Sequence, residues 1–218
     1  QPGRSVRRTG RKIGAGAAGK GAERKECMHL EQEGNRLWIK DGVSRVVIEP
    51  WGVNSLRVRM TKDAKMDEND WALTEKPAET DSSITFEEKD VTDPWYAGPE
   101  WEKYHQTGIC ATLVNGKITA KVSHEGWIIF YNQKGELLTE EYWRNRNRIN
   151  RYCVPLRVDA RELKPMPGRT DYELTARFEA FDDEKIFGMG QYQEKNLNKK
   201  GAILELAHRN SQASVPFM

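Results

Sequence analysis

An Asn-Gly pair at residues 115–116 constrains the fold of this chain more than any other sequence feature. It separates Gly108–Val114 from Lys117–Ser123, two runs rich in β-branched and apolar residues. Asn and Gly adopt the positive φ angles of a tight two-residue turn at low cost, so such a pair between two such runs predicts a β-hairpin. The sequence therefore predicts an antiparallel sheet in this part of the chain.

Most of the chain after residue 36 shows the pattern of strands. Ser55–Thr61 alternates polar and apolar residues, which is typical of a half-buried strand. No long run with the 3.6-residue period of a helix is found. We expect further strands at Leu37–Gly42, Ser44–Pro50, Ile84–Glu87, Trp127–Tyr131, Leu137–Leu138, Tyr172–Ala180 and Ala202–Leu206. The pattern predicts an all-β fold.

Residues 1–27 differ from the rest in composition. They are rich in Gly, Ala and Arg and hold almost no large apolar side chains, so they cannot bury enough surface to offset the entropy of ordering. We expect a disordered basic tail here and a single domain over residues 28–218. Eight Arg and Lys against two Glu give the tail a charge of +6, which leaves −4 for the domain from the total of +2.

That acidic domain argues against nucleic acid as a partner, because phosphate binding needs a clustered basic face. No apolar run approaches the ~18 residues that a membrane helix requires, and no segment has the charged and apolar parts of a signal peptide. Three scattered cysteines (Cys27, Cys110 and Cys153) suit neither a disulfide framework nor a metal site. We therefore expect a cytoplasmic protein that uses no metal or other cofactor.

A glycine-rich motif near the end of the chain carries a family resemblance. Phe187-Gly188-Met189-Gly190-Gln191 is followed by Asn210-Ser211-Gln212 and then by Val215-Pro216-Phe217. These residues resemble the turn and the following segment that close the N-terminal sandwich in glycoside hydrolase family 31. The amino-acid sequence of Leu204–Pro216 is most similar to that of the bacterial branch that holds α-xylosidases and some α-glucosidases. The chain then stops at Met218 without a polar tail, so we expect a piece of a longer protein.

The resemblance implies an antiparallel β-sandwich of the galactose mutarotase-like supersandwich type. It also implies a retaining α-glycosidase whose catalytic (β/α)8 barrel lies in polypeptide that follows this chain. In that family both catalytic carboxylates are on the barrel, and no motif resembling the nucleophile's Asp-Met-Asn-Glu occurs here. Glu140-Glu141 and Asp182-Asp183 are adjacent pairs, whose side chains point to opposite faces of a strand. We therefore expect no catalytic residue in this chain and no activity from it alone.

The same resemblance implies that a loop of the sandwich reaches into the sugar pocket of the barrel. Its position corresponds to Thr139, Glu140 and Glu141, with Trp143 beside them and Trp71 on another loop. We expect these five residues to bind the α-linked sugar. Their composition alone is equally typical of a solvated charged loop and of a packing tryptophan.

Two other functions fit the composition. The Pro- and Gly-broken stretch Thr92–His105 carries four aromatic residues, which suit sugar stacking but also a subunit contact. A stand-alone carbohydrate-binding sandwich and a sandwich used for homo-oligomerisation are therefore the alternatives. His208, Arg209 and Asn210 are expected to fix a domain junction.

Overall fold

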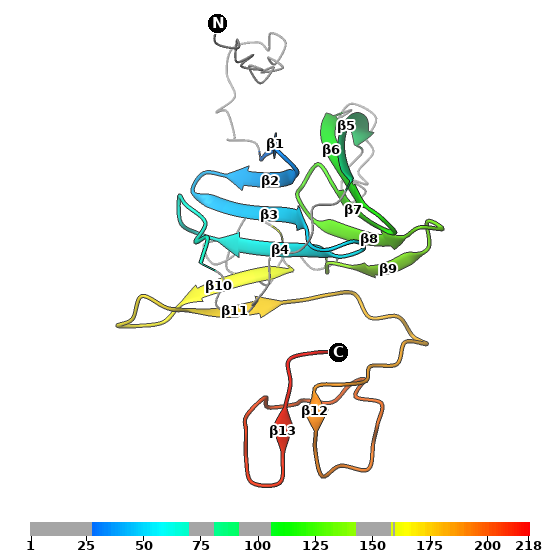
Figure 1. The fold of residues 1–218 in the computed structure, drawn as a ribbon. Helices are drawn as coiled ribbons and strands as arrows, with labels where there is room; N and C mark the ends of the chain where they lie inside the picture. Colours follow the sequence, from blue (N-terminus) through cyan, green and yellow to red (C-terminus); the bar gives the residue numbers. More distant parts are fainter. Residues whose placement is uncertain (1–27, 70–80, 92–105, 143–157, 159) are drawn as a thin grey trace, which may run out of the picture.

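The computed structural model describes residues 28–69, 81–91, 106–142, 158 and 160–218. The basic tail, the aromatic stretch at 92–105, Trp71 and Trp143 lie outside the described residues. The described chain consists of strands and connecting turns, drawn in Figure 1. No helix occurs in these ranges, and so none that is long and apolar enough to cross a membrane. The prediction of an all-β fold is confirmed.

The first sheet has four antiparallel strands in sequence order. Neighbouring strands pair directly, so that Ile39 of the second strand lies opposite Val46 of the third. Leu37 and Ile39 on the second strand, and Val46 and Ile48 on the third, are spaced two residues apart and fully buried, so these strands turn one apolar face toward the core. The strands are β1 (His29–Glu33), β2 (Arg36–Asp41), β3 (Ser44–Pro50) and β4 (Leu56–Thr61).

The second sheet has five antiparallel strands, also in sequence order. They are β5 (Ser82–Val91), β6 (Gln106–Asn115), β7 (Ile118–Val122), β8 (Ile128–Asn132) and β9 (Leu137–Glu140). The predicted hairpin joins β6 to β7, but its turn lies one residue later than expected. Asn115 pairs with Ile118 inside the sheet, and Gly116, with a φ of 57°, begins the turn.

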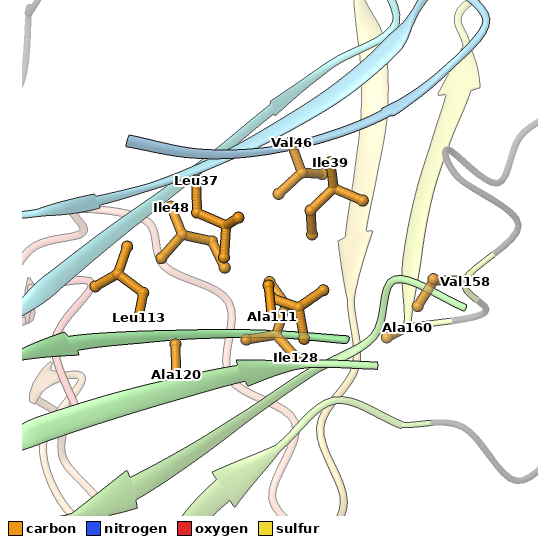
Figure 2. Packing of buried hydrophobic residues seen from close by; sticks show 11 residues of the cluster. Leu37, Ile39, Val46, Ile48, Ala111, Leu113, Ala120, Ile128, Val158 and Ala160 are labelled. Atoms are coloured by element: carbon orange, nitrogen blue, oxygen red, sulfur yellow. The ribbon is translucent and has the colours of Figure 1, made fainter. Parts of the chain in front are cut away.

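The two sheets face each other across the hydrophobic core, as Figure 2 shows. Leu37 and Ile48 of the first sheet oppose Leu113 of the second, and none of the three is exposed to solvent. The core also holds Ile39, Val46, Ala111, Ala120, Val122, Ile128, Val158 and Ala160. Burial of each large side chain contributes about 1.5–3 kcal/mol. The architecture is the antiparallel β-sandwich that the family resemblance implies.

Asn115 joins the two sheets at one end of the sandwich. Its side chain is fully buried and donates hydrogen bonds to the carbonyl oxygens of Gly52 (2.9 Å) and Ser55 (2.7 Å), in the connection between β3 and β4. Because the NH2 group of this buried side chain must be paired, the two carbonyl groups of the β3–β4 connection satisfy it and tie that connection to β6.

The chain leaves the sandwich through a hairpin and a long extended segment. The hairpin is formed by β10 (Arg161–Pro165) and β11 (Tyr172–Ala176), and a two-residue pair, β12 (Gly190–Gln191) and β13 (Ala213–Ser214), closes the chain. In Figure 1 the β12–β13 pair lies beyond the hairpin, away from the two sheets. The prediction of a strand at Ala202–Leu206 is wrong. Its alternation has no neighbouring strand to pair with, and Ile203 is wholly exposed.

Candidate functional site

The glycine-rich turn predicted at residues 187–191 is held by the last residues of the chain. The amide of Met189 donates to the carbonyl oxygen of Phe217 (2.7 Å), and the amide of Val215 donates to the carbonyl oxygen of Met189 (3.1 Å). The two motif segments are thus brought together by backbone hydrogen bonds, although they are more than twenty residues apart in sequence.

Both glycines of this turn are required by its geometry. Gly188 and Gly190 have φ angles of 107° and 112°, a region that residues with a side chain rarely adopt. A β-carbon on Gly188 would stand 2.4 Å from the carbonyl oxygen of Phe217. Met189 between them also has a positive φ, of 66°. The backbone conformation of this turn therefore depends on glycine at both positions.

Tyr192 and Ser214 complete this structure with side-chain contacts that the sequence did not point to. The hydroxyl of Tyr192 lies 3.0 Å from the carbonyl oxygen of Met189 and 3.0 Å from Oγ of Ser214. The Ser214 hydroxyl donates to the carbonyl oxygen of Ala207 (3.0 Å). A tyrosine directly after the glycine turn is the one sequence signal that could have indicated this role.

This C-terminal structure has no hydrophobic interior of its own. Between residues 164 and 218, all of which are described, no apolar side chain is buried, and Ser214 is the only buried residue. Large apolar side chains are instead exposed to solvent. We call them the C-terminal apolar set: Phe187, Leu197, Ile203, Leu206, Val215, Phe217 and Met218. The segment therefore leaves these seven large apolar side chains available for contact with a partner.

The predicted junction residues lie in the same segment and are all exposed. Arg209 forms an ion pair with Glu205, and Nδ1 of His208 accepts a long hydrogen bond from the amide of Ser214 (3.5 Å). The role of His208, Arg209 and Asn210 at a domain junction stays a prediction.

The predicted sugar-binding residues Thr139, Glu140 and Glu141 are at the end of β9. Thr139 and Glu140 are partly exposed, whereas Glu141 is only 6% exposed. The carboxylate of Glu141 forms a bidentate ion pair with Arg161 of β10, with Nε–Oε1 and Nη2–Oε2 distances of 2.6 and 2.5 Å. The adjacent carboxylates of Glu140 and Glu141 therefore lie in different environments and do not form a catalytic pair.

Arg161 was not predicted from the sequence. It is 2% exposed and occupies the first position of β10, on the same side of the strand as the buried Leu163. A charged residue on the same strand face as a buried apolar one indicates a buried ion pair. The short run Arg161–Pro165 has too few apolar residues to predict a strand from its pattern.

A second buried carboxylate lies on the outer face of the first sheet. Glu49 is 5% exposed, with Arg36 Nε at 3.0 Å and Arg59 Nη2 at 2.8 Å. The exposed Glu68 bridges the same two arginines at 3.0 and 3.3 Å. Partial desolvation acts to raise the pKa of Glu68, but the hydrogen bonds and positive charges of Arg36 and Arg59 outweigh it and lower that pKa. This network stabilises the sheet and offers no free acid or base.

Near this network is a surface hollow of about 390 Å³. Its lining includes Trp38, Lys40 and Arg45. Trp38 is 7% exposed, and the ammonium group of Lys40 lies 5.5 Å from its ring centroid, so the indole offers no open face for a sugar ring. No group of three His, Cys, Asp or Glu suited to a metal ion is found within the described ranges.

Comparison with known proteins decides the family. No protein-family model matches the chain. A family 31 glucosidase from Pseudescherichia vulneris, itself uncharacterized, is 42% identical over 180 residues, which are 78% of this chain and 30% of the relative. The crystal structure of a GH31 α-xylosidase from a soil metagenome, complexed with xylose, is also 42% identical, with a TM-score of 0.68 over 87% of this chain and 26% of that one. The chain is a domain of glycoside hydrolase family 31.

A more distant relative matches the same part of the chain, and a further solved structure shares its fold. α-Xylosidase A of Aspergillus niger is 27% identical over 199 residues, covering 83% of this family 31 domain and 23% of the relative. A GH31 α-xylosidase from Xanthomonas citri shares the fold, with a TM-score of 0.55 at 20% identity over 89% of this chain and 17% of that one. The domain thus spans less than a third of the length of each relative. The resemblance to a family 31 N-terminal sandwich domain is confirmed.

Proposed function

We propose that this family 31 domain packs on a catalytic (β/α)8 barrel of the same polypeptide, and that the joined protein hydrolyses terminal α-linked glucosides or xylosides with retention of configuration. Two relatives that are 42% identical are named as a family 31 glucosidase and a GH31 α-xylosidase. The domain corresponds to about a quarter of that α-xylosidase, which leaves room for a catalytic domain.

The C-terminal apolar set is the observation that carries the proposal. The glycine turn and its hydrogen bonds specify one backbone conformation, yet the side chains around it are exposed. Burying such side chains gains about 25 cal/mol for each Å² removed from water, so a partner surface would stabilise the segment. We infer that the barrel supplies that surface.

Without the barrel we expect no hydrolysis. A retaining glycosidase needs two carboxyl groups about 5–5.5 Å apart, one as nucleophile and one as acid/base. Glu141 is neutralised by Arg161, and Glu49 by Arg36 and Arg59, so neither buried carboxylate can serve. The catalytic pair would come from the barrel.

The contribution of this domain to catalysis is sugar binding at the end of β9. We propose that Thr139 and Glu140, which are partly exposed, contact the sugar. Trp143 and Trp71 are proposed as further contacts. Contacts that bind the sugar equally in the ground state and the transition state would raise kcat/KM by lowering KM, even though they are remote from the bond that is cleaved.

The test compares the isolated domain with a protein that joins it to a barrel. Each is assayed with nitrophenyl α-xyloside and nitrophenyl α-glucoside, and sugar binding by the isolated domain is measured by isothermal titration with maltose. Turnover by the joined protein only, without binding by the isolated domain, is the expected result. Hydrolysis by the isolated domain would overturn the proposal. Millimolar binding by it would instead favour a carbohydrate-binding module.

A further inference from the structure

The Glu141–Arg161 ion pair lies where three segments of the chain meet. Glu141 follows β9, and Arg161 begins β10. The amide of Ile128, at the start of β8, donates to Oε2 of Glu141 (2.8 Å), and Arg161 Nη2 donates to the carbonyl oxygen of Gly126 (2.7 Å). The two side chains therefore bind each other and also the backbone that leads into β8.

The backbone around Glu141 is hydrogen-bonded on both sides. The amide of Glu141 donates to the carbonyl oxygen of Ile128 (3.0 Å), and Glu141 forms an antiparallel bridge with Phe178. The amide of Tyr142 donates to the carbonyl oxygen of Arg177 (3.1 Å), and that of Glu179 to the carbonyl oxygen of Glu140 (2.9 Å). The segment after β11 thus pairs with residues 140–142, on the side opposite β8.

A buried ion pair is a poor source of stability, because desolvating both charges offsets most of their attraction. Its value is directional, since a bidentate guanidinium–carboxylate pair fixes distance and angle together. Here it fixes the position of Glu141. Glu140 and Thr139 directly precede this residue in the sequence. Both oxygens of Glu141 are engaged inside the domain, so this residue can act on a sugar only through the position of its neighbours.

We propose that Glu141 and Arg161 are positioning residues that hold the end of β9, and with it Thr139 and Glu140, in the orientation needed to contact the sugar. The inference rests on the proposed function for its consequence in catalysis. Its structural half, that the ion pair immobilises the end of β9, stands on the described contacts alone.

The structural half is tested by hydrogen exchange on the full 218-residue chain carrying Glu141→Gln. The amides of Ile128, Glu141 and Tyr142 should exchange at least about 10-fold faster, while those of Ile39 and Val47 keep their rates, because local opening does not need global unfolding. Glu49→Gln is the matched control, as it neutralises an equally buried, arginine-bound carboxylate in the other sheet. Unchanged exchange at the end of β9 would overturn the inference. Arg161→Lys, which keeps the charge but loses the bidentate geometry, gives the same readout should Glu141→Gln not fold.

The catalytic half is tested in the protein that joins this domain to its barrel. Glu141→Gln should raise KM by about 10-fold with kcat within about 2-fold, whereas Glu49→Gln should change neither. A purely structural role predicts equal losses of thermal stability in both variants and an unchanged KM, which would overturn the positioning role.

Glu140→Gln separates the two proposals. If it raises KM while Glu141→Gln does not, the positioning role is wrong, and if Glu140→Gln has no effect, the proposed sugar contact is wrong.

Discussion

Gly190 lies so close to Ala213 that a β-carbon on it would stand 2.1 Å from the Ala213 carbonyl oxygen. The two residues belong to β12 and β13, the short pair that closes the described chain. No rotamer change relieves a clash with backbone, so the pair can form only with glycine at position 190. This contact explains why the motif has glycine at a second position with positive φ.

Gly190→Ala should therefore open the β12–β13 pair. The cost combines about 1–2 kcal/mol for the φ of 112° with displacement of the Ala213 backbone. Limited proteolysis should show faster cleavage between residues 181 and 218, with the sandwich left intact. Gly201→Ala is the control, because Gly201 also has a positive φ, of 77°, but open space around it. Equal cleavage rates in the two variants would contradict the role of the contact.

Asn115→Ala should destabilise the sandwich by about 1–3 kcal/mol, since the carbonyl group of Gly52 loses its side-chain donor and that of Ser55 keeps only the amide of Trp51. Asn115→Asp should cost more, because its carboxylate would face two carbonyl oxygens. The free energy of unfolding in urea measures both. Asn54→Ala is the control: its exposed side chain accepts one hydrogen bond from the amide of Lys117 (2.9 Å), and its loss should cost about 0.5–1 kcal/mol.

The pH dependence of stability should contain a contribution from Glu68. Because Arg36 and Arg59 lower its pKa in the folded state, the contribution is present above the ordinary value of 4.5 and is lost as the pH falls through the folded pKa. The Glu68 side chain is 57% exposed, so the effect should stay below about 1 kcal/mol. The free energy of unfolding, measured by urea titration at several pH values below 4.5, should fall less steeply with falling pH for Glu68→Gln than for the unaltered chain. A slope that is equal in both, at low salt, would contradict this assignment.

Replacing three members of the C-terminal apolar set, as Phe187→Ser, Ile203→Ser and Phe217→Ser together, should leave the thermal stability of the isolated domain within about 0.5 kcal/mol, as is usual for exposed positions. The same change should weaken association with the barrel. To measure it, the connection between domain and barrel in the joined protein is cut by a protease. The altered domain should then no longer co-elute with the barrel, and activity should be lost. A stability loss of several kcal/mol in the isolated domain would show that these side chains are buried within it.

The strand pattern of the sandwich was predictable because it depends on local sequence. Alternation at Ser55–Thr61 and the Asn-Gly signal at 115–116 correspond to β4 and to the β6–β7 hairpin. The roles of individual polar residues were not predictable in the same way. Asn115 reads as a turn residue, yet its amide binds carbonyl groups about sixty residues earlier in the chain.

The candidate site shows the same division. The family resemblance implies Glu141 as a site residue, but its partner Arg161 is twenty residues later, in a strand that local patterns do not reveal. The false strand at Ala202–Leu206 shows the converse, since alternation without a pairing neighbour does not make a sheet. The sugar contacts of Thr139, Glu140, Trp143 and Trp71, and the cytoplasmic location, stay predictions. For the fifth predicted residue, Glu141, both carboxylate oxygens are bound within the domain.

The absence of buried apolar side chains between residues 164 and 218 has a consequence for how this sequence can vary. Folding of the sandwich places no requirement on the apolar character of Ile203 or Phe217, because neither contributes to its interior. In the proposed packing, the barrel surface that faces these side chains sets the requirement for apolar character. Divergence in this segment among relatives should therefore follow changes in the facing surface, and not changes in the sandwich itself.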